Sequence, residues 1–136
     1  MDKNITLEPA FVLHTRAFRE TSFIAELFTR NQGKIAVIAK GARRPKSKLK
    51  VIKTPSSLFT ISCTGKGQLK TLVHCEIREY FEASPESYKS LFYVNELVSK
   101  FLEIEDVHQN IFDQYLNVCR SLISPVKVEL EEKLRI

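Results

Sequence analysis

The sequence of 136 residues predicts an α+β fold, in which five short antiparallel strands are followed by helices. From residue 9 to residue 77, apolar side chains recur at every second position in short runs, which is the period of a strand. After residue 83 they recur at every third or fourth position, which is the period of a helix. The net charge also changes sign near residue 80. We therefore predict two domains, a strand domain over residues 1–80 and a helical domain over residues 81–136.

Five apolar runs predict the strands, which we expect at residues 9–18, 22–28, 35–39, 59–63 and 69–77. Short Gly-containing turns, Asn31-Gln32-Gly33 and Gly65-Lys66-Gly67, separate neighbouring runs. The fifth run alternates most clearly, and one face of it is expected to carry Leu69, Thr71, Val73, Cys75 and Ile77. Residues 41–55 are basic and short of large apolar side chains, which predicts a loop with one helical turn near Ser47–Val51. Five short antiparallel strands in about 80 residues suit a small barrel or a sandwich.

Capping signals predict where the helices begin. Ser84-Pro85-Glu86 supplies an N-cap, a proline at the first helical position and an acid in the first turn. Asp106 is expected to cap a second helix, and Ser124-Pro125 to start a third. The spacing also predicts the packed face of each helix. For the first helix this face consists of Tyr88, Leu91, Phe92, Asn95, Val98, Phe101 and Leu102. For the second it consists of Ile111, Phe112, Tyr115, Cys119, Leu122 and Ile123, and for the third of Val126, Leu130 and Leu134. Because no stop signal precedes Ile136, we expect the helical domain to be incomplete in this chain.

Composition and motifs argue against membrane, secreted and catalytic proteins. No stretch approaches the roughly 18 apolar residues of a membrane-spanning helix, and no apolar run follows Met1 to form a secretory signal. The three cysteines and three histidines show neither a CxxC pair nor metal-ligand spacing, so we expect structural thiols and no metal. No phosphate loop, nucleophile elbow or dinucleotide fingerprint occurs, so neither an enzyme nor a cofactor is expected. We predict a soluble protein of a reducing compartment.

The net charge of +5 is unevenly distributed. Residues 1–80 hold 15 Lys and Arg against 6 Asp and Glu, whereas residues 81–136 hold 6 against 10. No acid occurs in residues 27–75, which carry 11 basic residues and include the string Ala39-Lys40-Gly41-Ala42-Arg43-Arg44-Pro45-Lys46-Ser47-Lys48-Leu49-Lys50. Guanidinium and ammonium groups on a loop between strands favour a polyanionic partner, with nucleic acid first and an anionic membrane second. Phe18, Phe28 and Phe59 are candidate platforms on which bases would stack, although the sequence favours a position in the apolar core for each of them.

Several stretches resemble the bacterial recombination-mediator family RecO. The similar stretches are Phe11–Arg16, Arg19–Ser22, Leu27–Thr29, Ala39–Ser47, Gly65–Leu72 and Tyr93–Leu97. The resemblance implies an N-terminal OB-fold barrel and a helical domain that continues beyond Ile136. It also implies binding of single- and double-stranded DNA, strand annealing and assistance to RecA loading on DNA coated by the single-strand-binding protein SSB. The implied partners are RecR, the SSB C-terminal tail and, indirectly, RecA, and the implied location is the cytoplasm, at the nucleoid.

The resemblance places DNA contacts at Lys40, Arg43, Arg44 and Lys46, and extends them to Arg16 and Lys48. Where the family usually has Gln-Pro-Phe, this sequence has Thr54-Pro55-Ser56, which removes an aromatic platform. Two alternatives stay open. An RNA-binding OB-fold protein is disfavoured by the acidic second half. A polybasic membrane-surface adaptor is disfavoured because the basic string lacks the Trp- and Leu-rich face of an interfacial helix.

Overall fold

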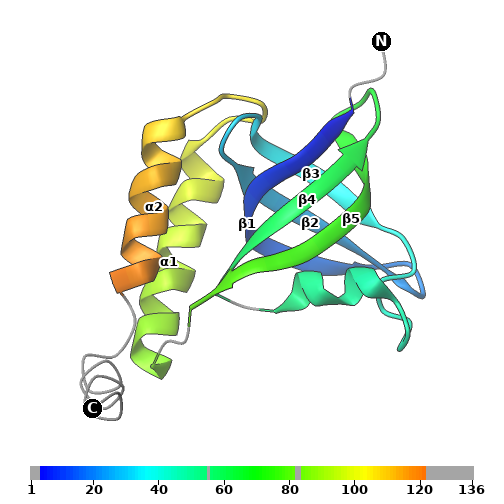
Figure 1. Cartoon of the computed structure of the whole chain (residues 1–136), viewed down its shortest axis with the longest axis horizontal. Helices are drawn as coiled ribbons and strands as arrows, with labels where there is room; N and C mark the ends of the chain where they lie inside the picture. Colours follow the sequence, from blue (N-terminus) through cyan, green and yellow to red (C-terminus); the bar gives the residue numbers. More distant parts are fainter. Residues whose placement is uncertain (1–3, 55, 82–83, 122–136) are drawn as a thin grey trace, which may run out of the picture.

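Within the residues that the structure describes, 4–54, 56–81 and 84–121, five strands form a closed barrel and two helices cover one side of it (Figure 1). The computed structural model has, in chain order, β1 (Ile5–Phe18), β2 (Ser22–Thr29), β3 (Gly33–Ala39), the 3-10 helix η1 (Lys48–Lys53), β4 (Ser57–Thr64), β5 (Leu69–Tyr80), α1 (Pro85–Phe101) and α2 (Gln109–Ser121). The α+β class and the five strands are confirmed, and η1 is the expected helical turn. None of the helices in these ranges is long and apolar enough to cross a membrane.

The strands follow the order β1-β2-β3-β5-β4 around the barrel, and β4 pairs with β1 to close it. Four of these pairings are antiparallel, but β3 and β5 run parallel, with Ala36 beside Leu69 and Ile38 beside Thr71. The prediction of a wholly antiparallel barrel is therefore wrong at this pair. A closed ring with an odd number of strands cannot alternate direction all the way round, so one parallel pair is required. The closed five-stranded barrel followed by helices is an OB-type architecture, as the family resemblance implied.

The apolar face predicted for β5 is wrong over most of its length. Cys75 is buried, but Leu69, Val73 and Ile77 are exposed. The pairing with β4 passes from Leu72 opposite Cys63 to His74 opposite Ser62, so Val73 is an extra residue in a bulge. A one-residue insertion moves the following side chains to the other face of a strand. Lys70 and Leu72 therefore point inward before the bulge, and Cys75 points inward after it.

The start of α1 is confirmed, whereas the start predicted for α2 is wrong. The Ser84 hydroxyl accepts a hydrogen bond from the Ser87 amide at 3.2 Å, and Pro85 is the first helical residue. At α2, the first helical bond runs from the Phe112 amide to the His108 carbonyl, not to Asp106. Asp106 lies in the preceding turn, where its carboxylate is 2.9 Å from the His108 ring. The Asp106 backbone packs directly against Gly33. A Cβ atom at that position would lie only 2.5 Å from the Asp106 carbonyl oxygen, so the contact requires glycine.

The predicted helical faces are confirmed in part. In α2, Phe112, Tyr115 and Cys119 are buried, while Ile111 is exposed. In α1, Leu91 is buried, but Phe92 and Phe101 are 65% and 78% exposed, although the spacing assigned them to the packed face. The following predicted positions lie outside the described residues: Leu122, Ile123 and the whole of the third helix.

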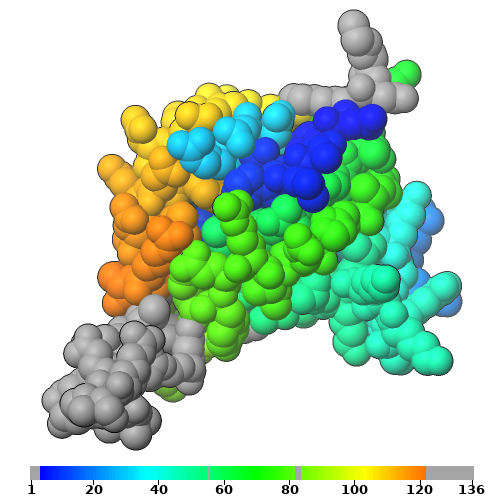
Figure 2. Space-filling view, viewed as in Figure 1, coloured from blue at the N-terminus to red at the C-terminus, as the bar shows by residue number. Residues whose placement is uncertain are grey.

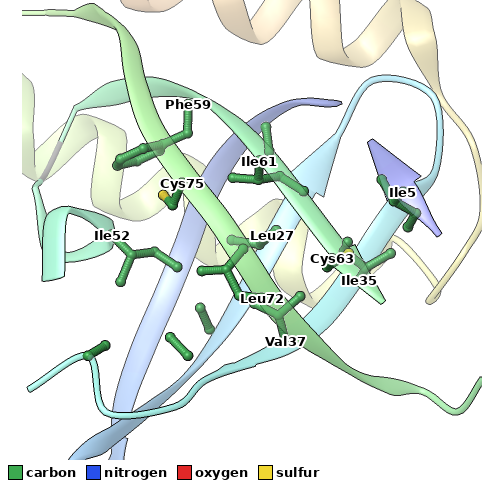
Figure 3. Close-up of a cluster of buried hydrophobic side chains, with 14 residues drawn as sticks. Ile5, Leu27, Ile35, Val37, Ile52, Phe59, Ile61, Cys63, Leu72 and Cys75 are labelled. Atoms are coloured by element: carbon green, nitrogen blue, oxygen red, sulfur yellow. The ribbon is translucent and has the colours of Figure 1, made fainter. Parts of the chain in front are cut away.

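Two apolar clusters hold these elements together. The barrel core fills the closed sheet (Figure 3) and consists of Ile5, Ala10, Ala25, Leu27, Ile35, Val37, Ala39, Ala42, Ile52, Phe59, Ile61, Cys63, Leu72 and Cys75. The docking cluster joins the barrel to the helices and consists of Phe11, Leu13, Phe28, Leu58, Phe81, Leu91, Phe112, Tyr115 and Cys119. Within the docking cluster, the Phe112 ring lies 5.0 Å from that of Phe11 and 5.4 Å from that of Phe28, between ring centroids. The helices are therefore packed on one outer side of the barrel, and the rest of its surface is free of them.

Candidate nucleic-acid interface

The basic string forms a folded loop between β3 and β4, which we call the basic loop (residues 40–53). Gly41 has φ +70°, a conformation that side chains disfavour, and it turns the chain sharply at the end of β3. Two backbone hydrogen bonds then form successive turns. The Arg44 amide donates to the Gly41 carbonyl at 3.0 Å, and the Ser47 amide donates to the Arg44 carbonyl at 3.1 Å. Ala42 and Ile52 are buried in the barrel core and hold both ends of the loop against it. The loop thus has its own hydrogen bonds and anchors.

Most of the basic loop lies at the end of the molecule away from the helices, but its last residues, Ile52 and Lys53, share a hollow of about 390 Å³ with Tyr88 and Phe92 of α1. In Figures 1 and 2 the loop occupies the lower right, in cyan to green, while the helices lie at the left in yellow-green to orange. The two helices each carry as many basic as acidic residues, so they contribute no net negative charge to oppose the field of the loop.

All six predicted contact residues are exposed: Arg16 on β1, and Lys40, Arg43, Arg44, Lys46 and Lys48 on the basic loop. Among the described residues, none of these six side chains forms an ion pair with a carboxylate. The charges are therefore solvated and available to an anionic partner. The structure brings the five loop residues into one segment, and it places Arg16 on a neighbouring strand.

Two cationic hollows border the basic loop, besides the one that it shares with α1. One, of about 480 Å³, is lined by Arg19, Thr21, Ser22, Ile38, Lys40, Gly41 and Arg44. The other, of about 530 Å³, is lined by Phe23, Arg43, Lys50, Lys53 and Thr54, and we call it the Phe23 hollow. Both combine cationic side chains with backbone or apolar surface, a combination that suits phosphate and base.

Cationic side chains lie over aromatic rings beside this loop. The Arg43 guanidinium carbon is 6.0 Å and the Lys53 ammonium nitrogen 5.2 Å from the centroid of the Phe23 ring. Arg43 also donates to the Arg19 carbonyl at 3.1 Å, and Lys53 to the Thr15 hydroxyl at 3.1 Å. These contacts restrain two long side chains that would otherwise lose more rotamer entropy on binding.

Two of the three candidate platforms are core residues, which is the position that the sequence favoured for each of them. Phe59 lies in the barrel core and Phe28 in the docking cluster, and both rings are closed off from solvent. Phe18 is partly exposed at the end of β1, with the Arg19 guanidinium carbon 5.2 Å from its centroid. Phe23 was missed because its strand period assigns it to the core. It lies on the inner face of β2 but close to the end of the barrel, where the basic loop meets it.

Three cations of the acid-free segment serve the packing of the helices instead of the surface. The Lys34 ammonium donates to the Ser99 carbonyl at 2.7 Å, and Lys70, 2% exposed, lies 3.2 Å from a Glu105 carboxylate oxygen. Arg30 makes two hydrogen bonds to Asp113, and these lower the pKa of that carboxyl from its usual value. The positive charge in residues 27–75 is therefore divided between a solvated loop and a set of contacts to α1, α2 and the turn between them.

Comparison with known proteins gives the family. The family model described as "Recombination protein O N terminal" matches residues 1–81, which include the whole barrel and the basic loop. The chain belongs to the recombination protein O (RecO) family. Its relatives include proteins named "DNA repair protein RecO" from Ralstonia nicotianae, Marinobacter nauticus and Polynucleobacter asymbioticus.

These RecO relatives resemble the chain over most of its length. Identity is 38% over 122 residues for the Ralstonia protein, 40% over 116 for the Marinobacter protein and 39% over 132 for the Polynucleobacter protein. The matches cover 89%, 85% and 94% of this chain, but 45%, 47% and 54% of the relatives. The chain thus spans about half the length of the curated relatives it matches. The resemblance to RecO stated from the sequence is confirmed.

Proposed function

We propose that this chain is the DNA-binding part of a DNA repair protein of the RecO type, acting in recombination. The observation that supports this proposal most directly is the basic loop, whose exposed cations have no carboxylate partner among the described residues. Its place at the end of the barrel, away from most of α1 and α2, leaves room for a long polyanion. Membership of the RecO family, in which the relatives carry the name of a DNA repair protein, supports the same assignment.

Binding is sequence-independent in this proposal because the contacts are made to phosphate. Lys40, Arg43, Arg44 and Lys46 provide the main contacts, and Arg16 and Lys48 extend them. Every nucleotide presents the same phosphate, and each phosphate neutralised releases condensed counterions, so affinity depends on salt. Single and double strands both bind, since both present a phosphate backbone.

Strand annealing follows from the same charges. Two complementary strands repel each other through their phosphates, and a surface that neutralises several of them lowers that repulsion. We infer that the chain promotes annealing, and that in the cell it acts in the cytoplasm, at the nucleoid. We further propose RecR and the SSB C-terminal tail as partners, with an indirect role in loading RecA on SSB-coated DNA; family membership supports these partners.

Salt dependence tests the proposal. Four to six phosphate contacts give an expected slope of about −3 to −4 in log K against log[salt] for single-stranded oligonucleotides. Affinities for oligonucleotides of different sequence are expected to agree within about tenfold. Anionic lipid vesicles of matched charge serve as the control. A slope near zero, a strong preference for one sequence, or tighter binding to vesicles than to DNA would contradict the proposal.

A further inference from the structure

Phe23 occupies an unusual position between the barrel core and the basic loop. It is the second residue of β2, where it pairs with Ala17 of β1 and Ala39 of β3. Small neighbours on both sides leave the ring uncovered by adjacent strands. The ring packs partly against the barrel core, as Leu49 and Val51 do from η1, and the remainder is accessible.

The accessible part of the ring opens on a hollow whose other charged walls are cationic. The Phe23 hollow measures about 530 Å³ and is completed by Arg43, Lys50, Lys53 and Thr54. That volume lies within the roughly 300–1,000 Å³ of small-molecule sites in proteins. The Phe23 ring is held in place by the barrel core and is surrounded by the side chains of Arg43, Lys50 and Lys53. The ring can stack against a planar group, and the three cations can contact phosphate oxygens.

Two of these cations already contact the ring. Lys53 reaches it from the C-terminal end of η1, and Arg43 from the start of the basic loop. These cation–π contacts place positive charge over the ring, and neither cation pairs with a carboxylate among the described residues. A base that stacked on the ring would take the place of these cations and leave them free to turn to its phosphate. A nucleotide whose base lay on the ring would therefore find its own phosphate next to a guanidinium and an ammonium group.

We propose that the Phe23 hollow is a nucleobase subsite, in which the ring stacks one unpaired base while Arg43, Lys50 and Lys53 hold the adjoining phosphates. The inference rests on the proposed DNA binding and deepens it, because it gives the surface a way to distinguish single from double strands. Every base has a π-face, so the subsite tolerates any sequence. In a duplex the bases are stacked inside the helix and do not reach the ring, and only the phosphate contacts remain.

The test compares three ligands of equal length: a single-stranded oligonucleotide, the same backbone carrying abasic sites, and a duplex. The wild-type chain is expected to bind the intact single strand more tightly than the abasic strand. Phe23→Leu keeps an apolar side chain against the barrel core but removes the aromatic face. It is expected to weaken binding of the intact single strand by about five- to a hundredfold, leaving the abasic strand and the duplex unchanged.

Phe101→Leu and Phe23→Tyr are the matched variants. Phe101 is an exposed ring at the end of α1 that does not line this hollow, so its variant is expected to bind all three ligands as the wild type does. Phe23→Tyr retains the ring and is expected to retain the preference for intact single strands. Thermal unfolding of each variant reports on the fold.

The inference is overturned by any of three results. The first is a wild-type chain that binds intact and abasic strands equally. The second is a Phe23→Leu variant with wild-type affinity for the intact strand. The third is a Phe23→Leu variant that loses affinity equally for all three ligands, since that loss would reflect the loop or the fold and not a base contact. In each case, salt-dependent binding that persists in the wild type would leave the proposed DNA binding intact.

Discussion

Removing four charges of the basic loop is expected to weaken DNA binding while leaving the stability of the fold nearly unchanged. In the variant Lys40→Ala/Arg43→Ala/Arg44→Ala/Lys46→Ala, four exposed side chains are shortened. Of these, only Arg43 has a side-chain hydrogen bond within the described residues, to the Arg19 carbonyl, and the bond is at the surface. The turn bonds of the loop are made by backbone groups and remain. We expect the free energy of unfolding to change by under about 1 kcal/mol.

The effect on DNA is expected to be much larger. Four lost phosphate contacts flatten the slope of log K against log[salt] by about 2 to 3 for a single strand. Affinity is expected to fall tenfold to a thousandfold, which corresponds to about 1.4 to 4 kcal/mol, and strand annealing to slow. Fluorescence anisotropy with a labelled oligonucleotide at several salt concentrations measures the affinity and the slope, and a circular-dichroism melt of the same samples measures stability.

Two controls make the comparison specific. Ile35→Ala, in the barrel core at 1% exposure, is expected to cost about 2–5 kcal/mol of stability with little direct effect on DNA contacts. Lys89→Ala/Lys100→Ala removes two exposed cations of α1 and is compared with Arg43→Ala/Arg44→Ala, which removes two from the loop. A folded four-site variant with wild-type affinity and slope would refute the reasoning, as would equal losses from the two double variants.

Three further outcomes are expected from the packing. Phe112→Ala empties the centre of the docking cluster and is expected to lower the free energy of unfolding by about 3–5 kcal/mol in a denaturant titration, and wild-type stability would show that the helices are not held there. Burial raises the pKa of the Cys75 and Cys119 thiols to about 12, so a thiol reagent at pH 8 is expected to modify them only as the chain unfolds; rapid modification of the folded chain would contradict their burial. Because the Arg30 hydrogen bonds lower the Asp113 pKa, their contribution is present above the unfolded pKa of that carboxyl and is lost as pH falls through the folded one. Asp113→Asn is therefore expected to reduce the stability difference between pH 7 and pH 3, and an unchanged difference would exclude this linkage.

The features that the sequence determined by itself are those that depend on neighbours along the chain. The period-two runs gave the strands, because side chains of a strand alternate between its faces wherever it pairs. Ser84-Pro85 marked the start of α1, because a cap and a first helical residue act within one turn. The acid-free segment and its densest string also predicted an exposed cationic loop, since a run of charges without large apolar side chains has little to bury.

The tertiary structure alone decided which of those residues face each other. Lys70 belongs to the same acid-free segment as Lys40, yet a bulged strand turns it inward and Glu105, 35 residues later, meets its charge. Phe23 has the strand period of a core residue, yet the end of the barrel and the basic loop leave part of its ring accessible. The parallel pairing of β3 and β5 arises only on closing a ring of five strands. In each case the segment that makes the deciding contact lies many residues away in the sequence. The hydrophobic period of one segment does not show how it pairs with another strand, how the barrel closes, or which distant side chains pack against it.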